Sequence, residues 1–270
     1  MKQTALVTGG ASGIGAEFVR QLRAAGWRVI SVDRTPQPGD PDAITLDLTE
    51  PDATDRLIDA LPLLPDLWIN NAGIFDFRAV TDLSPQRVDL YMDLHMRSLT
   101  HICRRVGALM AERGSGRILN MSSMSCWMPM PGIALYSATK AYIRVFSRAL
   151  RLELRDRDVS VTVACPGGID TSLFGLPANL RRLALRLGAT QSPERFVSNA
   201  LRRTLRNRKQ YINGPLNRLS ILLVGLLPDA LRYQIKPRLL DKLSKFGAGG
   251  GDICSGVGTE ELRKCSERRP

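Results

Sequence analysis

The chain has 270 residues, 44% of them hydrophobic and 24% charged, and contains no run of 18 apolar residues, so it reads as an ordinary globular chain without a spanning helix. Its formal charge of +12 is uneven: residues 1–180 carry 19 Lys/Arg and 19 Asp/Glu, whereas residues 181–240 carry 13 Lys/Arg against Glu194 and Asp229. Aromatic residues are not interleaved among these arginines and no base-reading motif appears, so we expect no nucleic-acid partner.

Cysteine and histidine usage points to a reducing compartment and away from metals. The first residues, MKQTALVTGG, lack an apolar signal region, so we expect a cytoplasmic protein whose five cysteines are free thiols. The cysteines show no CxxC spacing and only two histidines are present, so we predict no metal site.

Short apolar or β-branched runs alternate with longer helical patterns up to about residue 215. The strand-like runs lie at 4–9, 28–33, 43–48, 67–72, 117–123, 159–167 and 210–214. The helical patterns lie at about 13–26, 52–62, 85–113, 136–157 and 193–208. This alternation predicts an α/β fold: a Rossmann-like, doubly wound parallel sheet of about seven strands with helices on both faces. The connection RTPQPGDPD is too short and too rich in Pro and Gly for a helix, so we expect a loop there.

The first predicted strand runs into a glycine-rich turn, TGGASGIG, and then into a helix. Gly9, Gly13 and Gly15 lie where the missing side chains let a phosphate approach backbone N–H groups and the helix N-terminus. Eighteen residues after Gly15, the second strand ends at Asp33, whose carboxylate can bind an adenosine ribose and would repel a 2′-phosphate. The pattern predicts a site that prefers NAD to NADP, although the neighbouring Arg34 opposes this preference. A plain turn residue is the alternative interpretation of Asp33.

Four motifs follow one another along the chain: TGGASGIG (8–15), NNAG (70–73), YSATK (136–140) with a serine before it, and PGGIDT (166–171). Their order and spacing resemble the short-chain dehydrogenase/reductase family, in its single-domain branch with TGxxxGxG and YxxxK motifs, over about residues 3–215. The resemblance implies an NAD(P)-dependent oxidoreductase that interconverts a secondary alcohol and a ketone, as a homodimer or homotetramer. A non-catalytic dinucleotide sensor or interaction protein on the same fold is the alternative, but such proteins usually lose the tyrosine or the lysine.

The resemblance also implies the catalytic residues. Tyr136 would be the acid/base and Lys140 its partner, one helical turn away. A free phenol has a pKa near 10, and a nearby ammonium together with the oxidised nicotinamide would lower that pKa. Ser123 resembles the serine that orients the substrate oxygen, with Ser122 as the alternative if the register slips.

Cofactor contacts are carried over in the same way. Asn71, Ala72 and Gly73 resemble the segment that approaches the adenosine ribose, and Asp47 resembles the acidic residue that touches the adenine. The loop from Pro166 resembles the one that orients the nicotinamide. The complete predicted set is Thr8, Gly9, Ser12, Gly13, Ile14, Gly15, Asp33, Arg34, Asp47, Leu48, Asn71, Ala72, Gly73, Tyr136, Lys140, Pro166, Gly167, Ile169 and Thr171.

One position departs from the family pattern. The long helical stretch MDLHMRSLTHICRRV places His95 where the family usually has an asparagine, with Ser98 three residues later. The family asparagine holds a water that relays protons to the lysine. His95 could hold that water or relay protons itself, and we include it among the catalytic residues. The alternative, that His95 only packs against a neighbouring helix, stays open.

The C-terminal third suggests a lipophilic substrate and a second surface. Residues 171–190 resemble the family's helical substrate lid and are rich in leucine, which suits a hydroxysteroid, acyl-chain or polyketide-like substrate. We divide the chain into a catalytic domain (1–215), a basic and apolar helical appendage (216–246) and a flexible tail (247–270). The appendage fits peripheral binding to an anionic membrane, or equally a cover for the substrate mouth or a subunit interface.

Overall fold

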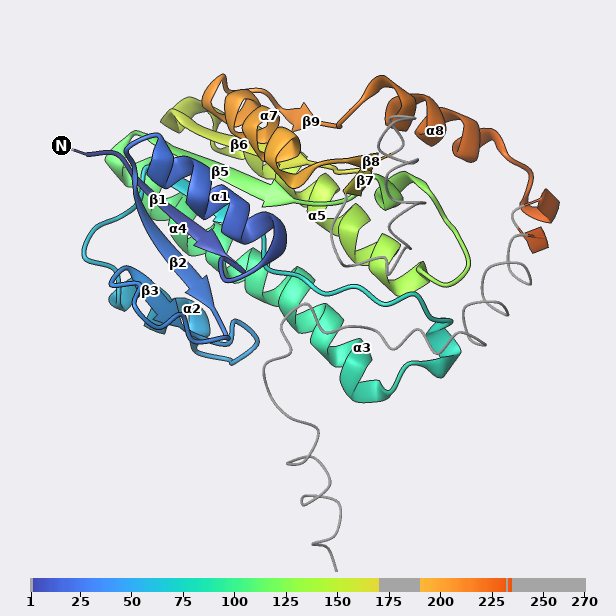
Figure 1. Ribbon diagram of the computed structural model, residues 1–270, viewed down its shortest axis with the longest axis horizontal. Coiled ribbons are helices and arrows are strands. Elements are labelled where there is room, and N and C mark those ends of the chain that lie inside the picture. The colour runs from blue at the N-terminus through green and yellow to red at the C-terminus, as the bar shows by residue number, and fades with distance from the viewer. Residues whose placement is uncertain (1, 170–189, 232, 235–270) are drawn as a thin grey trace, which may run out of the picture.

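Seven parallel strands form the central sheet of the computed structural model, which describes residues 2–169, 190–231, 233 and 234 (Figure 1). The strand order is β3-β2-β1-β4-β5-β6-β9. The predicted doubly wound α/β fold is therefore confirmed. The strands are β1 (Thr4–Thr8), β2 (Arg28–Asp33), β3 (Ala43–Thr45), β4 (Leu67–Asn70), β5 (Gly116–Met121), β6 (Val159–Ala164) and β9 (Gln210–Tyr211).

Helices cover both faces of the sheet and build a separate core on each (Figure 1). Successive side chains of a strand point to opposite faces, so Ala5 and Val7 of β1 join one core and Leu6 the other. The first core packs against α1 (Gly13–Ala24) and α7 (Pro193–Leu205). The second packs against α2 (Ala53–Asp59), α4 (Leu99–Arg113) and α5 (Ala134–Glu153).

Local sequence signals set several helix ends. The Ser84 hydroxyl accepts a hydrogen bond from the Arg87 N–H at the start of α3 (Pro85–Met92). Ser192 caps α7 in the same way, and a proline follows both caps at a position that needs no N–H. Gly114 ends α4 in the left-handed region, with φ of 71°. Short 3-10 turns lie at Val80–Asp82, Met124–Trp127 and Arg155–Arg157.

The helical stretch predicted over 85–113 is interrupted by a π-helical turn. This turn, Asp93–Ser98, joins α3 to α4 and contains His95 and Ser98, which are both buried. π-Helical turns are rare in proteins, but those that occur often lie at functional sites. The extra residue in the turn redirects the side chains of one helix face. Sequence periodicity did not reveal it.

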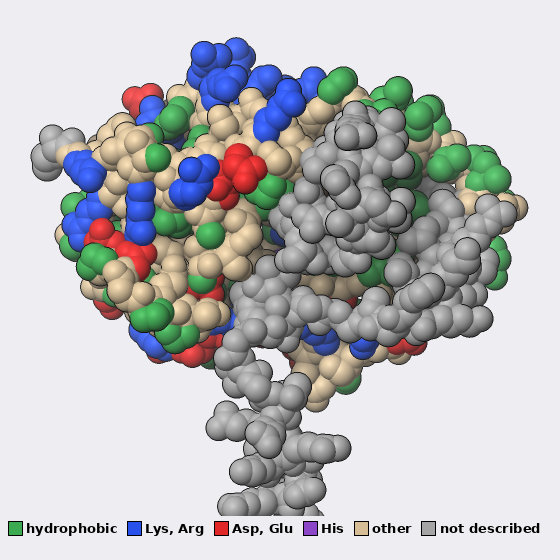
Figure 2. Space-filling view, in the orientation of Figure 1, with side chains coloured by type: hydrophobic (Ala, Val, Ile, Leu, Met, Phe, Trp, Pro, Cys, Tyr) green, Lys and Arg blue, Asp and Glu red, His purple; other side chains and the backbone are tan. Residues whose placement is uncertain are grey.

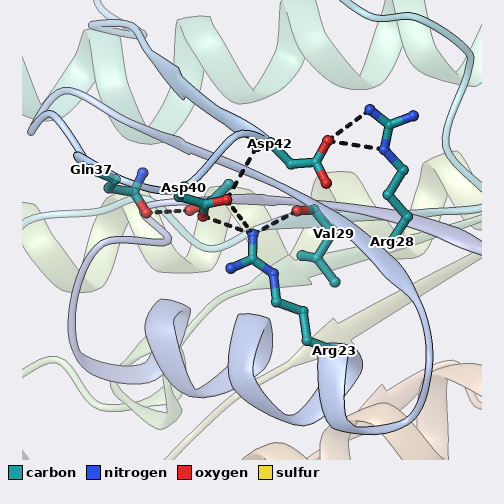
Figure 3. Close-up of polar contacts among 7 residues, drawn as sticks. Arg23, Arg28, Val29, Gln37, Asp40 and Asp42 are labelled. Carbon is teal, nitrogen blue, oxygen red and sulfur yellow. Dashed lines mark hydrogen bonds and ion pairs between the residues drawn. The ribbon is translucent and has the colours of Figure 1, made fainter.

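The predicted loop between β2 and β3 is confirmed, and ion pairs tie it to the sheet (Figure 3). One terminal nitrogen of Arg23 donates to both carboxylate oxygens of Asp40, at 2.9 and 2.7 Å, and to the Val29 carbonyl at 3.0 Å. Arg28 donates twice to one oxygen of Asp42, at 2.9 and 2.7 Å. These contacts fix a crossover that has no helix of its own.

The C-terminal part differs in detail from the prediction. A parallel pair of short strands, β7 (Gly168–Ile169) and β8 (Thr190–Gln191), was not predicted. In the appendage, the structure describes α8 (Pro215–Leu226), which ends before Pro228. No helix in the described ranges is long and apolar enough to cross a membrane. The predicted lid, apart from Thr190, and the predicted tail lie outside the described residues.

Candidate active site

The predicted site residues gather at the carboxyl ends of the parallel strands. The strand order reverses around β1, which pairs with β2 on one side and with β4 on the other. Each of four strands ends at or just before a predicted site residue: β1 before Gly9, β2 at Asp33, β4 before Asn71 and β5 before Ser123. In open α/β sheets, ligands bind at such a switch point, so the topology brings the separate motifs to one edge.

The glycine-rich turn is held close to the end of β4. Gly9 has a positive φ of 67°, and a Cβ atom on Gly15 would overlap the Gly9 carbonyl oxygen. The Asn71 side chain donates to the carbonyl oxygens of Thr8 and Gly9, at 3.1 and 3.2 Å. The Thr8 hydroxyl accepts from the N–H groups of Asn71 and Ala72, at 3.0 and 3.1 Å. The N-terminus of α1 follows this turn, with Ser12 at the cap position and Gly13 and Ile14 in the first turn of the helix.

Asp33 presents a buried carboxylate beside a cavity. Its side chain accepts N–H groups from Ala11 and Thr35, each at 3.0 Å, and the residue is only 4% exposed. Two backbone donors leave further lone pairs for ribose hydroxyls, since a carboxylate offers about four acceptor sites. The cavity beside it is lined by Gly9, Val32, Arg34, Leu46, Asp47, Leu48, Ala72 and Gly73, among others. The residues predicted to contact the adenosine group therefore line one cavity, with the exception of Asn71.

The same cavity includes Asp47 in a defined conformation. One of its carboxylate oxygens accepts both the N–H and the hydroxyl of Thr49, at 2.9 and 2.7 Å. The turn directs this acidic residue toward the cavity lined also by Asp33. The residues present fit a dinucleotide at its adenosine end.

Ser123, Tyr136 and Lys140 converge although they come from two different elements. Tyr136 lies in the first turn of α5, and Lys140 one turn later places its Nζ atom 5.6 Å from the centre of the Tyr136 ring. The Lys140 ammonium is buried and donates to the Met121 carbonyl at 3.1 Å. The hydroxyl of Ser123, just past β5, accepts the Ser125 N–H at 3.2 Å and lowers the pKa of the Tyr136 phenol. Ser122 is engaged elsewhere, since its hydroxyl donates to the Lys140 carbonyl at 2.7 Å.

Burial affects the pKa values of Tyr136 and Lys140 more than the interaction between the two side chains does. Burial raises the pKa of Tyr136 to about 12, and the hydrogen bond with Ser123 opposes that rise. Burial likewise lowers the pKa of Lys140 to about 8. The expectation that Lys140 pulls the tyrosine pKa down is therefore wrong for the protein alone, because desolvation disfavours both charged forms. The phenol is protonated at neutral pH.

His95 lies beside this group, and both of its ring nitrogens have protein partners. The Ile74 N–H donates to Nε2 at 3.0 Å, so Nε2 carries no hydrogen and Nδ1 does. Nδ1 then donates to the Thr139 hydroxyl at 2.9 Å, which in turn donates to the Tyr136 carbonyl at 2.9 Å. Burial, and then the charges of Lys140 and Arg87, hold the pKa of His95 well below its usual range. His95 is a neutral imidazole inside a continuous hydrogen-bonded chain.

Three neighbours of the site were not predicted. The Phe75 ring meets the Tyr136 ring edge-on, with centroids 4.9 Å apart, and Tyr91 meets His95 in the same way at 5.3 Å. Thr139 connects His95 to Tyr136. Its place three residues after Tyr136 is a local signal that could have revealed it, since a helical threonine often bonds to a preceding carbonyl. Nothing in the sequence marks Phe75, because its partner Tyr136 is distant along the chain, whereas Tyr91 lies only four residues before His95.

The loop after β6 closes the opposite side of the site. The Pro166 carbonyl accepts the Met124 N–H at 2.8 Å, which ties this loop to the segment that follows Ser123. The Gly167 N–H donates to the Asn213 side chain at 2.6 Å, and Ile169 is buried in β7. Thr171, the last residue of the predicted cofactor set, lies outside the described residues.

Comparison with known proteins now adds to this geometry. The model of the short chain dehydrogenase family matches residues 3–177. The chain belongs to the short-chain dehydrogenase family. It is therefore an oxidoreductase by family and takes a nicotinamide dinucleotide, in agreement with the glycine turn and the cavity beside Asp33.

Relatives within the short-chain dehydrogenase family cover most of the chain. Carbonyl reductase (NADPH) 2 of Sus scrofa is 31% identical over 203 residues, which are 72% of this chain and 82% of that protein. The very-long-chain 3-oxoacyl-CoA reductase of Bos taurus is 28% identical over 250 residues, 86% of this chain and 77% of that protein. The crystal structure of a short-chain dehydrogenase from Streptomyces avermitilis has a TM-score of 0.70 and 26% identity, and the match covers 92% of this chain and 98% of that one.

Proposed function

We propose that the protein interconverts a secondary alcohol and a ketone on a lipophilic substrate, with NAD as the preferred cofactor. The observation that carries this proposal is the convergence of Ser123, Tyr136 and Lys140 beside Gly73, where an added Cβ atom would lie 3.4 Å from the Lys140 Nζ atom. When bound, the nicotinamide supplies or accepts the hydride. The protein's own residues orient the substrate oxygen and exchange its proton.

The protonation of Tyr136 suits the reduction of a ketone. A phenol with a pKa of about 12 is neutral at physiological pH and can donate its proton to an oxygen that gains negative charge. The Ser123 hydroxyl, which lies against this phenol, would hold the same oxygen in line with it. The buried Lys140 ammonium would then stabilise the phenolate that remains.

His95 takes the role of a positioning residue in this proposal. It connects the backbone of Ile74, just past β4, to the first turn of α5, which carries Tyr136. Both ring nitrogens are bonded to protein groups in this connection, so neither is left to hold a water that relays protons to Lys140. The neutral ring thus fixes the tyrosine relative to the cofactor edge of the sheet.

Asp33 and its surroundings support NAD over NADP. A buried carboxylate at the end of β2 would repel a 2′-phosphate. Arg34 is the cation that lines the cavity, and it works against this preference.

A lipophilic substrate is supported by the segment after Ser123 and by one relative. The segment carries Met124, Trp127, Met128 and Met130, all partly exposed and soft enough to line an apolar pocket. The bovine relative is named for a very-long-chain acyl substrate, and its match covers most of this chain. Ketones on acyl chains, steroids or polyketide-like molecules are therefore the substrates to test first.

Self-association through α4 and α5 is a further part of the proposal. On α5, Val145 and Leu152 are 60% and 70% exposed, which is unusual for large apolar side chains on one helix. A dimer or tetramer would bury them. Light scattering after size exclusion would show a dimer or larger, and replacement of both residues by serine would shift the protein toward monomer.

The decisive experiment is a ketone panel with the purified full-length chain. NADH and NADPH oxidation would be followed with acyl, steroid and aromatic ketones, in parallel with Tyr136→Phe. We expect oxidation that depends on the ketone and is absent in the variant. Equal rates in the variant would contradict the assignment of Tyr136.

A further inference from the structure

Helix α8 exposes a stripe of leucines on one side. Leu216, Leu219, Leu222, Leu223 and Leu226 are 41%, 49%, 60%, 55% and 73% exposed. Their spacing places all five on one helix face, and Leu231 and Tyr233 continue the apolar surface past Pro228. Exposed apolar patches of this kind mark sites of association, because water is poorly accommodated against them.

The orientation of α8 is fixed by its opposite side. Asn217 is buried and donates to the Asn213 carbonyl at 2.9 Å, and the Asn213 side chain accepts the Gly167 N–H at 2.6 Å. A Cβ atom on Gly167 would overlap the Asn217 amide, so the helix lies directly on the loop after β6. The stripe therefore faces away from the loop after β6 and is a fixed surface of the protein.

Basic residues flank the leucine stripe. Arg202, Arg203, Arg206, Arg208, Lys209 and Arg218 are exposed, and no carboxylate in the described part of the chain forms an ion pair with them. Burial raises the pKa of Tyr211, and the charges of Arg203 and Arg218 oppose that rise, which places cations of α7 and α8 around the same strand end. Figure 2 shows blue side chains over α7 at the top and green ones over α8 beside them.

We propose that α8, together with the basic residues at the end of α7, binds the surface of an anionic membrane. The leucines would enter the boundary between headgroups and acyl chains, while the cations contact anionic headgroups. With 12 residues, α8 spans roughly 18 Å and would lie in the plane of the interface.

Charge distinguishes this occupant from a second copy of the chain. In a two-fold dimer built on α8, the same surface faces itself, so the basic residues of both copies would be brought together and repel each other. An anionic bilayer instead attracts these cations. Membrane binding also has a functional consequence, since α8 packs on the turn Met124–Trp127 that follows Ser123. A lipophilic substrate dissolved in the bilayer would then lie near the active site.

Vesicle co-sedimentation of the full-length protein tests the proposal. We expect binding to phosphatidylcholine vesicles with about 30% phosphatidylglycerol to be at least about tenfold tighter than binding to pure phosphatidylcholine, and to weaken with added salt. The pair Leu222→Ser and Leu226→Ser should reduce binding about tenfold. The single change Leu63→Ser, at an exposed leucine elsewhere, should not reduce it.

A second pair of variants tests the charges separately. Arg203→Gln with Arg206→Gln should remove most of the preference for anionic vesicles, whereas Arg104→Gln with Arg157→Gln, two exposed arginines on other elements, should retain it. Absence of binding to anionic vesicles by the wild type overturns the proposal. The proposal is also overturned if the wild type is a dimer that binds no vesicles and the pair Leu222→Ser and Leu226→Ser converts it to a monomer. That result would assign the stripe to a second copy of the chain. Sedimentation requires no turnover, so these results stand apart from the ketone assay.

Discussion

The Nδ1 atom of His95 lies 2.9 Å from the hydroxyl oxygen of Thr139, and that hydroxyl donates to the carbonyl of Tyr136. The Ile74 N–H occupies the other ring nitrogen at 3.0 Å. The residue that departs from the family pattern is thus bonded through one intermediate to the backbone of the predicted acid. Its effect on the reaction would be exerted through the position of Tyr136.

Removal of this connection should lower the rate of turnover more than it weakens substrate binding. We expect Thr139→Val, which keeps the side-chain shape but loses the hydroxyl, to reduce kcat about tenfold with KM nearly unchanged, because a small misplacement of a catalytic group is costly. His95→Asn should reduce kcat similarly. Steady-state kinetics against His101→Asn, a change at the exposed second histidine, provides the comparison.

The pH profile separates positioning from proton relay. Burial lowers the pKa of His95 well below its usual range, so the ring stays neutral and should contribute no step in log kcat between pH 6 and 7. The profile of His95→Asn should therefore have the same shape as that of the wild type. A step near pH 6.5 that disappears in the variant would support the relay instead.

Tyr136→Phe should abolish turnover without preventing cofactor binding. Loss of a positioned proton donor costs about 10²–10⁴ in rate, and the phenyl ring can still pack against Phe75. Tyr142→Phe is the matched control. Tyr142 lies on α5 like Tyr136, and its hydroxyl is 2.6 Å from the Thr100 hydroxyl of α4, away from the site. NADH fluorescence titration measures binding in parallel with kcat. Activity near the wild-type level in Tyr136→Phe would exclude the phenol as the acid.

Stability should rise with pH above 8 because of Lys140. Burial lowers the pKa of this lysine from 10.5 to about 8, so between these values the unfolded chain binds a proton that the folded protein does not. The free energy of unfolding should rise by about 2 kcal/mol between pH 8 and 10 because of this group. The same amount is lost when the pH is lowered from 10 back to 8. Urea titrations of the wild type and Lys140→Met would isolate it.

Other groups also titrate in this range, so the difference between the two proteins is the relevant quantity. Burial raises the pKa of Cys103 to about 12, which makes stability fall above pH 9 in both proteins alike. A second comparison with Lys209→Met, at an exposed lysine, should show the wild-type slope. An unchanged slope in Lys140→Met would mean that the buried ammonium does not carry the effect.

Asp33→Asn should shift the cofactor preference toward NADPH. The amide keeps the shape of the side chain and one acceptor oxygen but loses the charge that would repel a 2′-phosphate. We expect the ratio of kcat/KM for NADPH over NADH to rise about tenfold, equivalent to about 1.4 kcal/mol. Asp59→Asn removes the same charge at an exposed position and should leave the ratio unchanged. A wild-type protein that already favours NADPH would contradict the role given to Asp33.

Much of the fold could be predicted because its signals are local. The apolar runs, the caps at Ser84 and Ser192 and the proline-rich loop before β3 each depend on residues within a few positions of one another. The π-helical turn around His95 and the strands β7 and β8 could not be predicted in this way. They depend on packing against segments far along the chain, which periodicity does not record.

The sequence by itself determined the order of the motifs, the doubly wound sheet and the charge difference between the two parts of the chain. Tertiary structure decided that the Ser122 hydroxyl is bonded to the Lys140 carbonyl, and that both nitrogens of His95 are bonded. It also showed that burial raises the pKa of Tyr136 in the protein without a bound nicotinamide. The physical reason is that hydrogen-bond partners and desolvation are set by which distant residues meet, whereas motif spacing reports only what is near along the chain.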